Sequence, residues 1–236
     1  MSTIFNKLNA PSLKETVLQS LLGKILSGEL QPGQWLPAER DMAEQMGISR
    51  SSLHQAILAL NADGFLEIVP RRGIMVSDYR KHPTPQSLAA LMSYDSTELD
   101  YSLFADMMNA RLWLETECAR CACTHIYEST MEEMQQLVLA MKEPDANIGD
   151  LVYKFHYGLA QASGNSIYSM IFRGFESIIR TLTRRHYEVC PADCAASADH
   201  HQKVLDAISA KDEEMAEKAI RDILTRGIDV LAEKYV

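Results

Sequence analysis

The chain has 236 residues, enough for one large domain or two modest ones, and its 47% hydrophobic and 23% charged side chains are typical of a globular protein. No window approaches about eighteen consecutive apolar residues, and the N-terminus lacks the charged segment and apolar run of an export signal. These features exclude a membrane span and predict a cytoplasmic protein. The net charge of −9 falls in residues 81–236, because residues 1–80 hold eight basic and eight acidic residues. The acidity therefore argues against nucleic-acid binding by the second part of the chain only.

The first two predicted elements are helices. Apolar residues recur at helical spacing over residues 13–30, until Pro32-Gly33 stops the pattern. A short second helix is predicted from Pro37, which suits a first helical turn, to Gly47, which suits a C-terminal stop.

A third helix is predicted to begin directly after Ser49 and to end near Asp63-Gly64. Ser49 is a good N-cap, because its hydroxyl can accept a hydrogen bond from a free backbone N–H of the first turn. The predicted buried face recurs at helical spacing and consists of Leu53, Ala56, Ile57 and Leu60.

A hairpin and a linker follow. Two short strands are predicted at Phe65–Val69 and Ile74–Ser77, and the turn between them carries the basic tip Arg71-Arg72-Gly73. Residues 80–87 contain two prolines and no apolar run, which is typical of a linker.

A short helix, a glycine turn, a second helix and a basic hairpin together predict a winged helix-turn-helix, which we assign to residues 11–78. Short side chains let the third helix approach DNA closely, so that Arg50 can reach a guanine edge with His54 one turn further on the same face. Arg40 would flank them from the preceding helix. The expected DNA-contacting residues are Arg40, Ser49, Arg50, Ser51, Ser52, His54, Arg71, Arg72 and Gly73. The competing interpretation is a core helix capped by Ser49 whose other hydroxyls are merely solvated.

The second part of the chain shows no convincing strand and predicts an all-helical bundle, so the expected fold class is mainly α. We expect residues 1–79 to form the DNA-binding domain, 80–87 the linker, and 88–236 a domain for dimerisation and effector binding. A module of this size reads a useful length of DNA as a two-fold dimer on a palindromic operator, so a homodimer is expected. The predicted helices cover roughly residues 86–94, 98–124, 129–142, 146–163, 165–188, 197–209 and 212–234.

The five cysteines, which are odd in number, do not form the pattern of a secreted disulfide framework, and we expect reduced thiols. Cys118, Cys121 and His125 share one helical face and could form a redox or metal sensor. Cys190 and Cys194 could pair but fall in a predicted loop. Small core residues are the simpler interpretation of the first group.

The stretch from Ile25 to Val76 resembles the winged helix-turn-helix of the GntR family of bacterial transcription regulators. The residues that carry the resemblance include Leu36–Arg40, Gly47, Ser49-Arg50 and the Arg72-Gly73 wing. In that family, the residues matching Arg40 and Ser49–Ser52 contact operator DNA, and the wing enters the minor groove. Many members carry an arginine at the position of His54, so the resemblance implies a different base preference there.

Three motifs within residues 98–232 resemble the effector domain of the FadR branch, the FCD domain: "MMNARLWLETECARCA", "YKFHYGLAQASGNSIYSMI" and "ADHHQKVLDAISAKDEEMAEKAI". The resemblance implies that a metabolite, often a carboxylate and in one case a fatty acyl-CoA, changes operator affinity. Many members also hold a divalent metal through an Asp, a His four residues later and two further histidines. Here His156 and His201 match two of these histidines, but Val152 and Ile223 replace the other ligands, so no cofactor is expected. His200, Asp199 or a cysteine are the conceivable substitute ligands.

Without a metal, an arginine must neutralise an acidic ligand, and Arg111 matches a family position that points into the pocket. A structural ion pair between Arg111 and Glu115 is the alternative, and Asn165 could equally cap the next helix. The expected effector-binding residues are Arg111, His156, Asn165, Arg180, Arg184 and His201.

The predicted function is therefore a transcription regulator that binds double-stranded operator DNA and a small carboxylate or acyl-CoA effector. A metal- or thiol-dependent sensor on the same DNA-binding module is the main alternative. An enzyme and an architectural DNA protein are less favoured, because the sequence has no phosphate loop, nucleophile elbow or complete ligand set and no basic excess.

Overall fold

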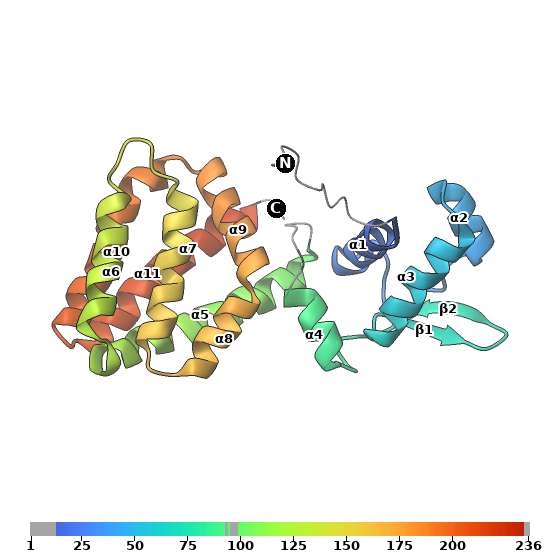
Figure 1. Ribbon diagram of the computed structural model, residues 1–236, viewed down its shortest axis with the longest axis horizontal. Helices are drawn as coiled ribbons and strands as arrows, with labels where there is room; N and C mark the ends of the chain where they lie inside the picture. The colour runs from blue at the N-terminus through green and yellow to red at the C-terminus, as the bar shows by residue number, and fades with distance from the viewer. Residues whose placement is uncertain (1–12, 93, 95–98, 234–236) are drawn as a thin grey trace, which may run out of the picture. The chain divides into compact units, whose positions relative to one another are not determined.

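The computed structural model describes residues 13–92, 94 and 99–233, which form two compact units (Figure 1). Residues 13–91 with 99–100 make up the first unit, and the second contains residues 101–233. The N-terminal residues to which the export-signal prediction refers lie mostly outside the described residues. Helices predominate in both units, and the described strands form a single hairpin, which confirms the predicted fold class.

The first unit begins with three helices, α1 (Leu13–Leu26), α2 (Glu39–Met46) and α3 (Arg50–Ala62). α1 packs against α3 through its apolar stripe, and the buried face of α3 is the one predicted from its spacing. α1 ends four residues earlier than predicted, because Gly28 adopts a positive φ of 80° that no helix contains.

The turn between α2 and α3 has the predicted chemistry. Gly47 adopts the left-handed conformation with φ of 64°, which glycine reaches without steric cost, and it ends α2. The Ser49 hydroxyl accepts a hydrogen bond from the Ser52 amide at 3.2 Å and so caps α3. The start of α3 is therefore fixed by local hydrogen bonding.

Ser49→Ala is expected to lower the free energy of unfolding by roughly 0.5–2 kcal/mol, because one amide of the first turn of α3 loses its partner. Ser51→Ala is the control. Ser51 is exposed, and its hydroxyl lies 3.2 Å from that of Ser49 but accepts from no amide of the described first turn, so its effect should stay within about 0.5 kcal/mol. Urea unfolding followed by circular dichroism measures both. Equal effects of the two changes would show that the cap does not stabilise α3.

The hairpin consists of β1 (Leu66–Val69) and β2 (Gly73–Val76), paired antiparallel with Leu66 opposite Val76. At its tip Arg71 and Gly73 both have positive φ, 64° and 122°, so the chain reverses tightly between the strands. Met75 of β2 pairs with Glu67 of β1 and also forms an isolated antiparallel bridge with Trp35, which therefore lies along the other edge of β2. The predicted hairpin is confirmed; β1 begins one residue later than predicted, and β2 is shifted by one residue towards the turn.

Part of the expected linker is helical, because α4 (Pro85–Met92) begins inside residues 80–87. Just before it, the Thr84 hydroxyl donates to the Asp63 carbonyl at 3.0 Å, which ties this segment to the end of α3. The domain limits at residues 79 and 88 stay predictions.

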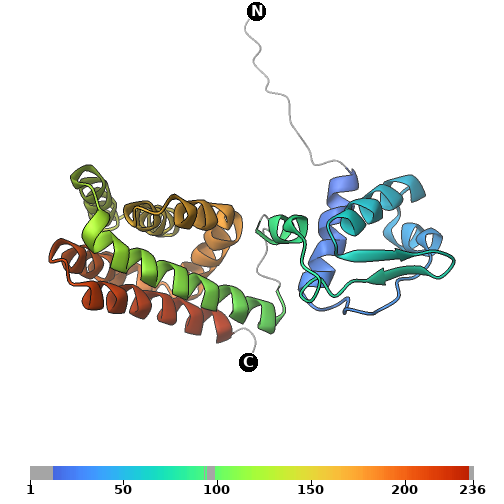
Figure 2. The ribbon, with the colours of Figure 1, turned by 90° about the horizontal axis from the view of Figure 1, so that it is seen from below.

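The second unit is a bundle in which α5 and α11 run alongside each other (Figure 2). Its core centres on fully buried side chains of α5, α7 and α10, such as Cys118, Phe155, Leu159 and Val204. The helices are α5 (Tyr101–His125), α6 (Glu128–Ala140), α7 (Ile148–Ala162), α8 (Ser166–Gly174), α9 (Glu176–Val189), α10 (Ala192–Ser209) and α11 (Glu213–Ala232).

Two helix predictions in this unit are wrong. The helix predicted over residues 165–188 is two helices, because Phe175 leaves the helical conformation (φ −89°, ψ 14°) between α8 and α9. α10 begins at Ala192 rather than near residue 197, so Cys194 is helical and not in a loop. Among the described residues, no helix is long and apolar enough to cross a membrane.

Candidate functional sites

The start of α3 presents the predicted DNA-contacting side chains to solvent. Arg50 is 73% exposed, and Ser49 and Ser51 are exposed beside it. Arg40, at the start of α2, is 84% exposed and lies near Asp41, with 3.3 Å between Nε and Oδ1. These groups and the free amides of the first turn are the kinds of donor that bind phosphate and base edges.

The basic tip of the hairpin is exposed as predicted. The Arg72 guanidinium lies over the ring of Trp35, 5.1 Å from its centroid, and this cation–π contact restrains the side chain. The wing therefore exposes two arginines, of which Arg72 is held by Trp35.

Glu39, the first residue of α2, was not predicted to belong to this surface. Its two carboxylate oxygens lie 3.1 and 3.2 Å from Nδ1 of His54, and Oε2 lies 3.9 Å from Nε of Arg50. The only signal was an acidic residue in the first turn of the preceding helix, fifteen positions before His54. The contact between Glu39 and His54 depends on how α2 and α3 pack against each other, so sequence spacing does not show it.

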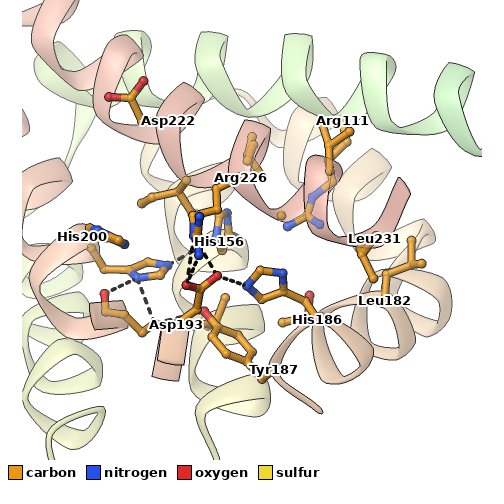
Figure 3. A pocket seen from close by; sticks show the side chains of 18 of the residues that line it. Arg111, His156, Leu182, His186, Tyr187, Asp193, His200, Asp222, Arg226 and Leu231 are labelled. Carbon is orange, nitrogen blue, oxygen red and sulfur yellow. Dashed lines mark hydrogen bonds and ion pairs between the residues drawn. The ribbon is translucent and has the colours of Figure 1, made fainter. Parts of the chain in front are cut away.

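A cavity of about 260 Å³ opens in the second unit (Figure 3). Side chains from α5, α7, α9, α10 and α11 line it, and its apolar wall includes Met108, Val152, Leu182, Ile223 and Leu231. Arg111, His156 and His201 from the predicted effector site line it together. The remaining polar lining includes His186, Asp193 and Arg226.

A buried carboxylate organises one side of the cavity. Glu115 is fully buried and accepts hydrogen bonds from Nε of Arg111, at 2.5 Å, and from Nδ1 of His156. Burial alone would raise the pKa of Glu115, but the charges of Arg111 and His156 outweigh it and lower the pKa to about 2. The ion pair considered as the alternative role of Arg111 is therefore present, while its guanidinium still lines the cavity.

The two predicted histidines face each other, with 3.4 Å between their Nε2 atoms. Nδ1 of His201 lies 2.7 Å from the Ser197 carbonyl, so this nitrogen carries the hydrogen. Burial and the neighbouring His156 lower the pKa of His201 to about 3, so its ring is neutral near pH 7.

These residues do not form the metal site that the family resemblance would imply. Val152 and Ile223 both line the cavity and supply hydrocarbon where a metal needs ligands. In the part of the chain that the structure describes, no group of three or more His, Cys, Asp or Glu side chains is placed to hold a metal ion.

The cavity also contains an ionic cluster that was not predicted, formed by Asp193, Arg226 and His186. Asp193 accepts from Nε of Arg226 at 2.9 Å and lies 3.0 Å from Nε2 of His186 (Figure 3). Burial lowers the pKa of His186, so the ring is neutral and Nδ1 is an acceptor. This buried Nδ1 has no hydrogen-bond partner among the described residues.

Asn165, Arg180 and Arg184 do not line this cavity, contrary to the predicted effector set. The Asn165 side chain accepts from the Ile167 amide and caps α8, which was its alternative role. Arg180 forms ion pairs with Asp150 and Glu176 and, with Arg184, borders a separate hollow between α7 and α9. Of the six predicted effector-binding residues, the cavity lining therefore contains Arg111, His156 and His201.

The arrangement of the cysteines does not favour the alternative of a redox or metal sensor. The five cysteines, all within the described residues, are free thiols. Burial raises the pKa of Cys118 to about 12, so it is no thiolate near pH 7. His125 directs Nδ1 to the Cys121 carbonyl rather than to a thiol.

Both units match known family models. The model "Bacterial regulatory proteins, gntR family" matches residues 13–76, and the model "FCD domain" matches residues 106–226. Together with the winged helix-turn-helix, these matches define a DNA-binding transcription regulator and not an enzyme. The chain belongs to the GntR family, and its C-terminal part is an FCD domain.

The names of similar proteins refer to different regulatory roles. The "Putative L-lactate dehydrogenase operon regulatory protein" of Escherichia coli (strain K12) is 31% identical over 218 residues, 88% of this chain and 82% of its own. LutR of Bacillus subtilis is 26% identical, over 88% of this chain and 96% of its own. The fatty acid metabolism regulator protein of Klebsiella pneumoniae is 26% identical, over 77% of this chain and 75% of its own.

Among solved structures, Lar is described as controlling the expression of the Listeria monocytogenes agr system. It matches with a TM-score of 0.60 at 20% identity, over 97% of this chain and 99% of its own. This likeness concerns the fold alone.

Proposed function

We propose that this regulator changes its affinity for operator DNA when a small carboxylate binds in the cavity of the second unit. The exposed groups of α3, Arg40 and the wing contact the operator, and the FCD domain binds the effector and joins two copies into a homodimer. Such a dimer acts in the cytoplasm, where its DNA is. The observation that carries the proposal is the cavity into which Arg111 projects.

Arg111 suits an anion because its one polar contact with a described residue uses Nε, so its two Nη groups stay available. A guanidinium binds a carboxylate through two parallel hydrogen bonds. Glu115 holds the arginine in place and also offsets its charge. A ligand therefore meets a preformed donor whose side chain has already lost its freedom of movement.

The size of the cavity favours a small acid over an acyl-CoA. Pockets that bind drug-sized ligands measure roughly 300–1,000 Å³. The cavity of about 260 Å³ is smaller than such a pocket. The name of the E. coli relative is a reason to include lactate among the acids tested.

Arg111→Lys tests this site with little damage to the fold, because lysine keeps the positive charge beside Glu115 but lacks the planar fork. We expect unchanged operator binding by the free variant and loss of the rise in melting temperature that carboxylates give the EDTA-treated wild type. Arg184→Lys, outside the cavity, is the control and should respond normally. A full response of Arg111→Lys would show that Arg111 does not bind the effector.

A further inference from the structure

The acidic side chain of Glu39 lies within the surface proposed to read DNA. It is 21% exposed, whereas its neighbours Arg50 and His54 are 73% and 49% exposed. A carboxylate that close to DNA repels phosphate, so it lowers affinity for every sequence. A carboxylate at this position is therefore expected to improve some other property of DNA binding.

Helix capping does not explain the position. Glu39 is in the first turn of α2, where the helix dipole favours an acid. However, among the described residues its carboxylate contacts side chains of α3, and not the free amides of α2. Both oxygens lie within 3.2 Å of Nδ1 of His54, the geometry of a hydrogen bond shared by the two oxygens.

This contact settles how His54 meets a base. Because a carboxylate only accepts hydrogen bonds, Nδ1 of His54 carries the hydrogen and donates it. The ring orientation is then fixed, and Nε2 is the nitrogen left for DNA. An imidazole held in this way offers one atom in a defined direction, and it loses less side-chain entropy on binding than a mobile ring.

We propose that Glu39 is a specificity-determining residue of this regulator, which acts by positioning His54 against one base pair of the operator. It weakens binding to DNA in general through its charge and strengthens discrimination through the fixed ring. The inference rests on the proposed DNA-contacting role of α3.

Glu39→Gln tests the proposal, because it removes the charge and keeps the shape. Asp41→Asn is the matched control. Asp41 lies on the same helix and is 49% exposed, and its carboxylate forms an ion pair with Arg40 alone among the described residues. The operator is first selected with the wild type from a randomised DNA library. Affinities for this operator and for its single-base variants are then measured by fluorescence anisotropy.

We expect both variants to bind non-operator DNA more tightly, because each loses one negative charge. Only Glu39→Gln should lose discrimination, by about fivefold or more, at the base pair where His54→Ala also loses it. In the His54→Ala background, Glu39→Gln should cause no further loss there, which a merely structural role would not produce.

Two results would overturn the inference. In the first, Glu39→Gln discriminates between base pairs as Asp41→Asn does. In the second, the loss of discrimination caused by Glu39→Gln adds in full to the loss caused by His54→Ala. If His54→Ala and Arg50→Ala both discriminate like the wild type, the proposed reading surface itself is wrong. If His54→Ala loses discrimination and Glu39→Gln does not, only the role of Glu39 fails.

Discussion

Glu115→Ala is expected to lower the free energy of unfolding by about 3–5 kcal/mol, the usual cost of removing one partner from a buried ion pair. Glu115 is fully buried, and the change leaves Arg111 and His156 without the carboxylate that both contact. Urea unfolding at neutral pH measures the loss. Glu117→Gln is the control on the same helix, because Glu117 is 28% exposed and pairs with Arg120 near the surface, where such pairs contribute only about 0–1 kcal/mol.

The same network predicts a pH dependence. The pKa of Glu115 is lowered from its ordinary 4.5 to about 2, so its contribution to stability is complete above pH 4.5 and is lost as the pH falls towards 2. Unfolding curves between pH 6 and pH 2.5 should therefore converge for the wild type and Glu115→Gln. A difference that stays constant over this range would mean that the carboxylate is not ionised in the folded protein.

Arg50→Ala is expected to remove sequence discrimination at one operator base pair. A bidentate contact between a guanidinium and guanine supplies roughly 1–3 kcal/mol, or about 5- to 150-fold in affinity. The side chain is 73% exposed at the start of α3, and its contact with Glu39 is long at 3.9 Å, so it is free to turn towards a base. Fluorescence anisotropy with the operator and its single-base variants measures the loss.

Arg221→Ala is the control, since Arg221 is an exposed arginine of α11 paired with Glu217. It should bind every DNA like the wild type. If Arg50→Ala weakens binding to all sequences by the same factor, Arg50 contacts phosphate and does not read a base.

Local signals made the first unit predictable. Gly47 ends α2 through its left-handed conformation, and Ser49 caps α3 through its own hydroxyl, so both act within a few residues. The hairpin turn at Arg71-Arg72-Gly73 is equally local. Glu39 escaped prediction because its partner, His54, is fifteen residues away and is reached only across two packed helices.

The cavity was less predictable because five helices build it. Arg111, His156 and His201 were found through the family resemblance and line it together. Glu115 was considered only as a partner one turn from Arg111, whereas tertiary packing also brings it to His156, 41 residues further along the chain. Asp193 and Arg226 meet across 33 residues, a pairing that no local spacing reveals.

Helix boundaries failed where periodicity continued through a break. The apolar spacing of residues 165–188 fits one helix, yet the chain departs from helical geometry at Phe175. A single non-helical residue leaves the hydrophobic pattern intact, so the pattern does not show it.

The most direct measurement is the affinity of the EDTA-treated protein for its selected operator, with and without the carboxylate that raises its melting temperature most. We predict that this acid changes operator affinity at least about fivefold, the lower end of typical coupling between two sites, and that Arg111→Lys abolishes the change. Unaltered operator affinity at a saturating concentration of an acid that binds through Arg111 would contradict effector control by this cavity.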